Sequence, residues 1–157
     1  MSEAAVITID GPSGSGKGTV SQRMAGQLGW HYLDSGAIYR ALAYATELAG
    51  YKPDLDKQQI VQLARKLDLS FRPANDGGAD VLLAGKDISA FIRTEECGEW
   101  ASKLAADGDI RAALLQRQRD FRQPPGLIAD GRDMGTVVFP DAAHKFFLTA
   151  SAQIRAE

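Results

Sequence analysis

The chain has 157 residues, 45% of them hydrophobic and 24% charged, which fits one hydrophobic core or one core with a small attached subdomain. Its net charge of −2 and its pI of about 5.7 provide no global positive field, so we expect no nucleic-acid partner. The N-terminus lacks the basic start of a signal peptide, and no apolar stretch approaches the roughly 18 residues of a membrane span, which predicts a cytoplasmic protein without a membrane partner.

The first 49 residues predict an alternation of strands and helices. Residues 6–10 (VITID) are a short apolar run that ends at a glycine, as a buried parallel strand does. Residues 19–28 contain no proline and suit a helix, and residues 31–33 predict a second short strand. The next helix is predicted over 35–49, where apolar residues recur at spacings of four, three and four and form one apolar face.

Residues 50–105 have a different pattern. A helix predicted over 56–67 is followed by strands over 69–73 and 80–85, with the turn sequence NDGGA at 75–79 between them. These features indicate an antiparallel hairpin, which does not belong in an alternation of parallel strands and helices. We therefore interpret this stretch as an inserted subdomain.

The alternation resumes in the last third of the chain. Helices are predicted over 94–106 and 109–121, and buried strands over 127–130 (LIAD) and 145–150 (KFFLTA). A further helix is predicted to begin at Ser151, and the chain ends one turn into it. Because a natural domain rarely ends within an element, we expect a C-terminal truncation.

The sequence GPSGSGKGT follows the first predicted strand and opens the first predicted helix, which is the context of a P-loop. The predicted fold is therefore α/β, a P-loop NTPase-type parallel sheet flanked by helices with an inserted, hairpin-containing subdomain. Gly14, Gly16 and Gly18 would let the backbone curl into an anion nest at the positive end of the helix dipole. Lys17 would bring an ammonium to the β- and γ-phosphates of ATP, and Thr19 a hydroxyl to the phosphates or their Mg²⁺. The predicted ATP site comprises Gly11, Pro12, Ser13, Gly14, Ser15, Gly16, Lys17, Gly18 and Thr19.

The P-loop departs from the usual pattern at Gly18, because Ser or Thr commonly follows the lysine directly. The alternative interpretation is a Gly/Ser-rich turn with no ligand. The strand before it and the helix after it favour the phosphate-binding interpretation.

Two segments are candidates for binding the phosphoryl acceptor. Arg40 lies about 200° from Ile38 around its predicted helix, opposite the apolar face, from which it could reach into a cleft. The alternative is a solvated arginine, with Ser35 as a helix N-cap. Arg132 and Asp133 follow the LIAD strand at its C-terminal end, where ligands bind in open α/β sheets. The alternative there is a polar turn held by its own ion pair.

The helix predicted from Asp109 carries several arginines. Arg117 falls on its apolar stripe and is interpreted as a snorkelling side chain, whereas Arg119 and Arg122 are expected to form a solvated basic face. Structural roles are expected for three isolated residues: His31, His144 and Cys97.

No catalytic base or metal-ligand cluster is apparent in the sequence. A phosphate monoester is mostly a dianion at pH 7, so as an acceptor it needs positioning and charge neutralisation rather than proton removal. This favours a nucleoside monophosphate over an alcohol. The Asn-Lys-x-Asp reader of guanine-specific GTPases is absent, while another P-loop kinase and an ATP-driven switch remain alternatives.

GPSGSGKGT, LDSGAIYR and IADGRDMGTVVFPDA together resemble the bacterial cytidylate kinases, which transfer a phosphoryl group from ATP to CMP or dCMP. GKGT is the form typical of nucleoside monophosphate kinases. The resemblance runs through essentially the whole chain. It implies a core domain of residues 1–34 and 112–157, and a monophosphate-binding region at 35–111.

The resemblance also implies roles for matching positions. CMP would be bound by Ser35, Tyr39, Arg40, Ser102, Arg111, Arg132 and Asp133. Within this set Ser102, Arg111 and Asp133 would line the cytosine pocket, where an unpaired buried group would penalise uracil. Lys17 and Arg132 would be catalytic, and Thr19 would contact Mg²⁺.

In this family an arginine-rich lid, a further strand and a terminal helix follow the position where the chain ends. Without that lid we expect the chain as given to bind nucleotides weakly and to be nearly inactive. We also expect the protein to be a monomer.

Overall fold

A computed structural model describes residues 3–74 and 79–149 of the chain. The chain divides into two compact units. The first comprises Met1–Ser35, Pro73–Ala79 and Arg119–Glu157, and the second comprises Gly36–Arg72 and Asp80–Gln118. Within the described residues, none of the helices combines the length and the apolar character that crossing a bilayer requires. The expected assignment of domain roles to 1–34, 112–157 and 35–111 stays a prediction.

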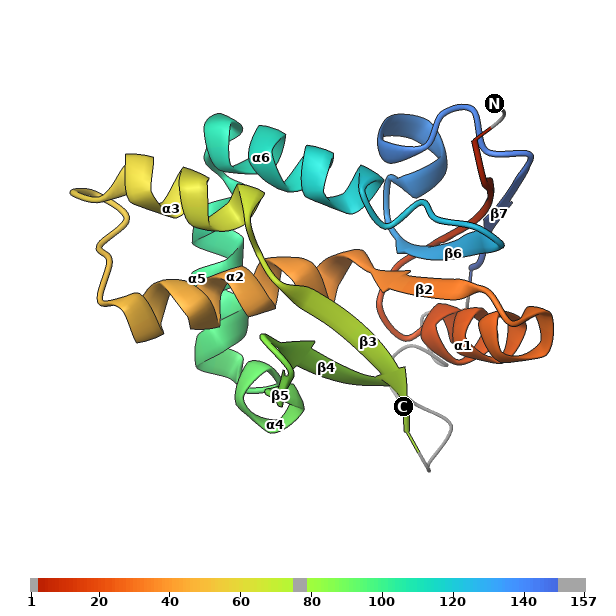
Figure 1. Cartoon of the computed structure of the whole chain (residues 1–157), viewed down its shortest axis with the longest axis horizontal. Helices are drawn as coiled ribbons and strands as arrows, with labels where there is room; N and C mark the ends of the chain where they lie inside the picture. Colours follow the sequence, from red (N-terminus) through yellow and green to blue (C-terminus); the bar gives the residue numbers. More distant parts are fainter. Residues whose placement is uncertain (1–2, 75–78, 150–157) are drawn as a thin grey trace. The chain divides into compact units, whose positions relative to one another are not determined.

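The first unit is built on a four-stranded parallel sheet (Figure 1). Its strands are β1 (Ala5–Asp10), β2 (His31–Asp34), β6 (Gly126–Gly131) and β7 (His144–Phe147), in the order β2-β6-β1-β7. Every neighbouring pair is parallel. This confirms the predicted α/β class and its four parallel strands.

Two helical elements cover opposite faces of this sheet. In Figure 1, α1 (Lys17–Leu28) lies below the strands and η1 (Met134–Val138) lies above them. Ile9 and Ile128 pack with Ala25 of α1 in one core cluster. On the other face, a Cβ at Gly135 of η1 would lie only 2.8 Å from Thr8 Oγ1. Side chains alternate along β1, so Ile9 packs towards α1 on one face of the sheet and Thr8 lies against η1 on the other. The sequence analysis did not predict η1, a single π-helical turn.

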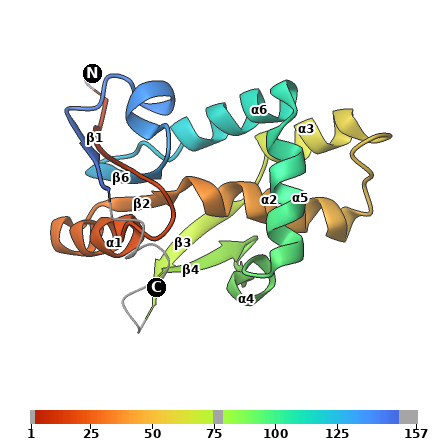
Figure 2. The same cartoon turned by 180° about the vertical axis from the view of Figure 1, so that it is seen from behind.

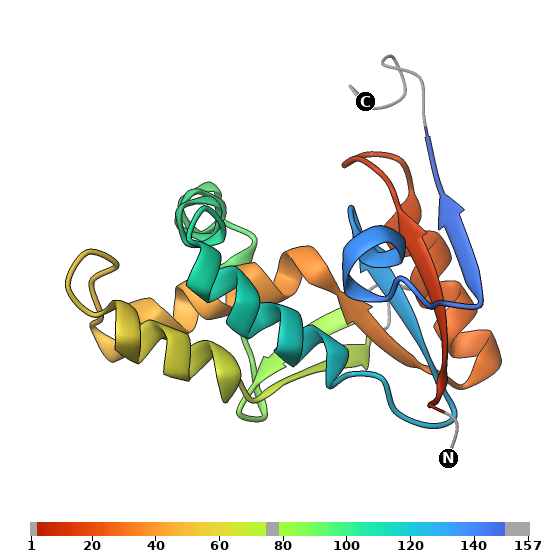
Figure 3. The same cartoon turned by 90° about the horizontal axis from the view of Figure 1, so that it is seen from above.

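Strand β7 corrects one prediction. Phe146 is 50% exposed and Phe147 67% exposed, although residues 145–150 were expected to form a buried strand. The reason is its position, since β7 pairs with β1 at the edge of the sheet (Figure 3). Residue 150 and the helix expected from Ser151 lie outside the described residues.

The second unit holds most of the remaining elements. They are α2 (Ser35–Ala49), α3 (Lys57–Arg65), β3 (Leu69–Pro73), β4 (Ala79–Leu83), β5 (Lys86–Asp87), α4 (Ser89–Ile92), α5 (Glu95–Ala105) and α6 (Gly108–Arg119). The strands form a separate sheet in the order β3-β4-β5. Strands β4 and β5 are antiparallel, and Figure 1 draws β3 and β4 in opposite directions. The inserted antiparallel element is thus confirmed. Its expected turn at 75–79 lies mostly outside the described residues, and β5 and α4 were not predicted.

Helices supply the core of the second unit. Ile38 and Leu42 of α2 are completely buried, as the predicted apolar face requires. Helices α3 and α6 lie side by side (Figure 2), and Ile60 of α3 and Leu114 of α6 are completely buried. Lys57 of α3 joins the two helices through an ion pair of 2.8 Å between its Nζ and Asp109 Oδ2.

Candidate active site

The predicted phosphate loop connects β1 to α1. Gly14 and Gly16 have φ angles of 78° and 84°, in the left-handed region where residues with a Cβ are strained. These two glycines curl the loop as predicted. Gly18 does not, because it lies in the first turn of α1 and has no positive φ. The curling role expected for Gly18 is therefore wrong.

The N-terminus of α1 leaves its first amide groups uncapped by a side chain. Gly16 is the N-cap residue and has no side chain with which to accept a hydrogen bond, and no acidic residue occupies the first turn. The first N–H groups of a helix have no partner within the helix, and they carry the positive end of the dipole. This terminus is therefore suited to bind an anion that supplies the acceptors itself.

Lys17, the first residue of α1, faces a buried carboxylate. Its Nζ lies 3.8 Å from Oδ1 of Asp130, and their side chains are 19% and 4% exposed. Asp130 lies near the end of β6, the strand next to β1. Tyr32 of β2 donates a 2.7 Å hydrogen bond to the other carboxylate oxygen. The carboxylate that pairs with Lys17 is therefore itself held by a hydrogen bond from β2.

The environment of Asp130 shifts its proton affinity. Burial raises its pKa from 3.8 to about 6; repulsion from Asp34 and Asp10 adds to the shift, while Tyr32 and Lys17 oppose it. At pH 7 roughly nine tenths of a group with such a pKa is ionised, so the ion pair with Lys17 persists. Burial also raises the pKa of Tyr32 far above its ordinary value, so its hydroxyl remains a donor.

Asp130 and Tyr32 were not among the predicted site residues. The sequence signal for Asp130 was present, since an acidic residue follows the apolar run LIA at the carboxyl end of a buried strand. No comparable signal identifies Tyr32, because its partner is 98 residues away.

In the first unit the predicted acceptor residue Arg132 lies beside the phosphate loop. Its Nη2 donates a 3.1 Å hydrogen bond to Ser13 Oγ of that loop. Ser35, at the start of α2, is buried, and its Cβ would lie 3.0 Å from a Cβ at Gly131. Asp133 is exposed and directly precedes η1. The structure thus brings Arg132, and through Gly131 also Ser35, to the end of β6.

The other predicted acceptor residues belong to the second unit. Arg40 is not the solvated arginine of the alternative interpretation, because its Nη1 donates to the carbonyl oxygens of Ile92 (2.6 Å) and Thr94 (3.2 Å). Ser102 is exposed on α5, where its hydroxyl donates 3.1 Å to its own helix. Arg111 is exposed on α6. Tyr39, on α2, is half-buried.

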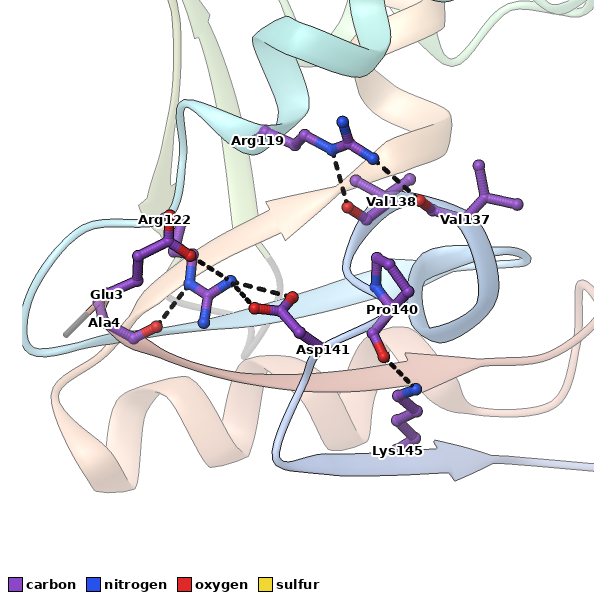
Figure 4. A network of polar contacts seen from close by, with 9 residues as sticks. All are labelled: Glu3, Ala4, Arg119, Arg122, Val137, Val138, Pro140, Asp141 and Lys145. Atoms are coloured by element: carbon purple, nitrogen blue, oxygen red, sulfur yellow. Dashed lines mark hydrogen bonds and ion pairs between the residues drawn. The ribbon is translucent and has the colours of Figure 1, made fainter.

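The arginines expected to form a solvated basic face are instead engaged by the protein (Figure 4). Arg119 donates to the carbonyl oxygens of Val138 (3.0 Å) and Val137 (3.2 Å) in η1. Arg122, only 16% exposed, donates 2.6 Å to the Ala4 carbonyl and forms a two-pronged contact with Asp141 at 3.2 and 3.0 Å. The prediction is wrong because both arginines bind groups of the first unit that are not their neighbours in sequence.

Arg117 also serves a structural purpose. Its Nε donates a 2.7 Å hydrogen bond to the Leu67 carbonyl beyond the end of α3. The expected structural roles of His31 and Cys97 agree with their contacts. His31 Nε2 lies 3.0 Å from the Pro124 carbonyl oxygen, and the Cys97 thiol donates to the backbone carbonyl oxygen of Arg40. Burial raises the pKa of that thiol, so Cys97 is not an activated nucleophile.

A phosphate loop at the end of β1, with its lysine paired to a carboxylate on the adjacent parallel strand, defines the class of P-loop nucleotide-binding proteins. Within the described residues no group of three or more His, Cys, Asp or Glu side chains could hold a metal ion.

Comparison with known proteins narrows this class. The family model of cytidylate kinase matches residues 7–157. The chain is 60% identical over 151 residues to a cytidylate kinase of Methylococcus capsulatus, covering 96% of this chain and 67% of that protein. It is 55% identical over 157 residues to a cytidylate kinase of Marinomonas sp., covering 100% of this chain and 69% of the relative. The chain spans about two thirds of the length of these relatives. It belongs to the cytidylate kinase family.

Proposed function

We propose that this protein transfers the γ-phosphoryl group of ATP to CMP and dCMP. The observation that carries the proposal is the contact between Arg132 and Ser13, because it joins a predicted acceptor-binding residue to the donor-binding loop. Both lie at the carboxyl edge of the parallel sheet, where α/β proteins bind ligands. Membership in the cytidylate kinase family supports the choice of substrates.

The donor side would act through fixed positive charge. The uncapped N-terminus of α1 and the loop amides would bind the β-phosphate, and the Lys17 ammonium would reach the β- and γ-phosphates. Asp130 would hold this ammonium in place. Because Lys17 Nζ lies 3.8 Å from Asp130 Oδ1, the N–H groups of the lysine can still donate to phosphate oxygens.

The acceptor side would need positioning and charge neutralisation. The CMP phosphate is mostly dianionic at pH 7 and needs no base. An arginine beside the phosphate loop suits the task, because a guanidinium remains charged and can bridge phosphate oxygens from two groups. Arg132 would hold the acceptor phosphate in line with the γ-phosphorus and stabilise the charge of the transition state.

Magnesium would fit beside this loop. The Thr19 hydroxyl lies two residues beyond Lys17 in the first turn of α1, and Thr19 is exposed, so an oxygen donor of the type that Mg²⁺ prefers is available beside the proposed phosphate site. The ion would neutralise charge on the phosphate oxygens of ATP.

The remaining roles are proposed for the acceptor. Ser35 would contact the CMP phosphate and ribose side, and the second unit would contribute Tyr39, Arg40, Ser102 and Arg111. Asp133, Ser102 and Arg111 are exposed, and they would provide the donors and acceptors that distinguish the cytosine edge from uracil. We further propose that the protein acts as a cytoplasmic monomer.

A test compares the acceptors CMP, dCMP, UMP and AMP in a coupled assay of ADP formation on a full-length version of the protein, with CMP affinity measured separately by calorimetry. We expect CMP and dCMP to be preferred. Replacing Arg111 by alanine should weaken CMP binding at least about tenfold and reduce discrimination against UMP, because a charged hydrogen-bond donor to the base is lost. Arg65→Ala, an exposed arginine in the last turn of α3, serves as the matched control and should leave both quantities unchanged.

Two outcomes would contradict the proposal. ATP turnover that no nucleotide acceptor stimulates would favour an ATP-driven switch. Unchanged CMP affinity and selectivity in Arg111→Ala would remove Arg111 from the proposed cytosine pocket.

A further inference from the structure

Asp10 makes a two-pronged contact with the turn that follows Arg132. Its Oδ1 accepts a 2.8 Å hydrogen bond from the Met134 amide, and its Oδ2 accepts a 2.9 Å hydrogen bond from the Gly135 amide. Asp10 is the last residue of β1 and is 6% exposed. One buried carboxylate therefore satisfies the first two amides of η1.

The segment that carries Arg132 is held at both of its ends. On its N-terminal side, Gly131 accepts a 3.1 Å hydrogen bond from the Gly11 amide. On its C-terminal side, the Asp10 carboxylate holds residues 134 and 135. Only Arg132 and Asp133 lie between these two attachments. The phosphate loop begins directly after Asp10, so one residue connects the strand that carries the loop to the turn that carries the arginine.

Close packing fixes the turn against β1. A Cβ at Gly135 would lie 2.8 Å from Thr8 Oγ1, and a Cβ at Gly131 would lie 3.0 Å from the Met134 side chain. The turn has little space to shift while these contacts and the Asp10 carboxylate are in place.

The charge of Asp10 has an unfavourable neighbour. Repulsion from Asp10 is one of the causes that raise the pKa of Asp130. An asparagine at this position would remove that repulsion, yet it could accept only one of the two N–H groups and would present an NH₂ donor to the other. Two charge-assisted hydrogen bonds require the carboxylate. The negative charge of Asp10 is therefore needed to hold the turn, although it repels Asp130.

We propose that Asp10 is a positioning residue, which acts through the turn to place the Arg132 guanidinium against the phosphate loop and the acceptor phosphate. This inference rests on the proposed role of Arg132. Asp10 touches no reacting atom itself, and its carboxylate has the two N–H groups of the turn as partners.

The test uses Asp10→Asn and compares the affinities of CMP and cytidine, measured by NMR titration or calorimetry. Cytidine lacks the phosphate, so the ratio of the two affinities reports the contribution of the phosphate site. We expect Asp10→Asn to weaken CMP about tenfold and cytidine less than about twofold, because a misplaced guanidinium loses charged hydrogen bonds to the phosphate only. Arg122→Ala is the matched control, since it breaks a polar network of the same unit and should lower thermal stability without changing the ratio.

A double-mutant cycle with Arg132→Ala separates positioning from general damage. If Asp10 acts through Arg132, Asp10→Asn should have almost no further effect on CMP affinity once the guanidinium is absent. Equal losses for CMP and cytidine, or a full additional loss in the Arg132→Ala background, would overturn the inference. If Arg132→Ala alone leaves CMP affinity unchanged, the proposed role of Arg132 fails, and the positioning role fails with it.

A second variant keeps the test decisive if Asp10→Asn does not fold. Gly135→Ala places a Cβ 2.8 Å from Thr8 Oγ1 and pushes the same turn away from β1 while the carboxylate remains. It should reproduce the selective loss of CMP affinity. An unchanged ratio of CMP to cytidine affinity in folded Gly135→Ala would contradict the proposal.

Discussion

Replacing Asp130 by asparagine is expected to stabilise the folded protein at pH 8 and to have about half of that effect at pH 5. The carboxylate is 4% exposed, and burial raises its pKa from 3.8 to about 6. The attraction of Lys17 and the hydrogen bond from Tyr32 are therefore too weak to offset the loss of solvation. Asparagine has nearly the same shape and keeps an acceptor for the Tyr32 hydroxyl, but it carries no charge.

The magnitude follows from the pKa difference. The unfolded chain loses the Asp130 proton near pH 4, whereas the folded chain retains it until about pH 6. Between these values the folded state binds more protons, so the free energy of unfolding falls as the pH rises through this window. Each pKa unit corresponds to about 1.4 kcal/mol, and the ionised carboxylate lowers stability by roughly 3 kcal/mol above pH 7. We expect Asp130→Asn to recover about 1–3 kcal/mol of this at pH 8.

The assay is urea unfolding of wild type and variant at pH 8 and pH 5, followed by tryptophan fluorescence. Asp141→Asn is the matched control with the opposite sign, because the hydrogen bond from Arg122 lowers the pKa of Asp141. The contribution of Asp141 is present above its unfolded pKa and is lost as the pH falls, so Asp141→Asn should destabilise the protein at pH 8.

Two results would refute this reasoning. A lower free energy of unfolding for Asp130→Asn at pH 8 would show that the Lys17 and Tyr32 contacts outweigh the desolvation of the carboxylate. An equal gain at pH 5 and pH 8 would show that the effect does not arise from ionisation.

The remaining predictions concern the phosphate loop and two glycines. Lys17→Ala should abolish phosphoryl transfer and weaken ATP binding at least about tenfold by calorimetry, whereas Lys66→Ala, at an exposed lysine, should change neither. Gly126→Ala should destabilise the fold by about 1–3 kcal/mol, because its Cβ would overlap the Trp30 ring. Gly26→Ala, in α1 with no atom within 4 Å of its Cβ, should instead stabilise by about 0.5–1 kcal/mol. The same sign of change in both glycine variants, measured by urea unfolding, would contradict the packing argument.

Local features of the chain were predictable because their causes are local. The strand at residues 5–10 is an apolar run, and the helix after it begins at Lys17, directly after Gly16. Gly14 and Gly16 adopt left-handed φ angles, which glycine permits because it has no Cβ. The P-loop context and the turn to an antiparallel hairpin arise from the same short-range rules. These rules also explain the failure at Gly18, since a glycine that permits a curl does not require one.

Family resemblance extended the sequence analysis to residues such as Arg132, which the structure places beside Ser13 of the phosphate loop. Short-range rules could not predict the partners of Arg122 or the exposure of β7. Arg122 binds Ala4, 118 residues away, and β7 is exposed because it lies at the edge of the sheet. Both depend on which segments become neighbours after the chain has folded.

The sequence by itself determined that a phosphate loop joins a buried strand to a helix, and that an acidic and a basic residue follow a later buried strand. Only the tertiary structure decided that these two strands are neighbours, with Asp10 in register with Gly131. That pairing lets Asp130 meet Lys17 and lets Asp10 hold the turn after Arg132, across 124 residues of chain. The physical reason is that strand order is set by the burial of both faces of the sheet, which no local pattern encodes.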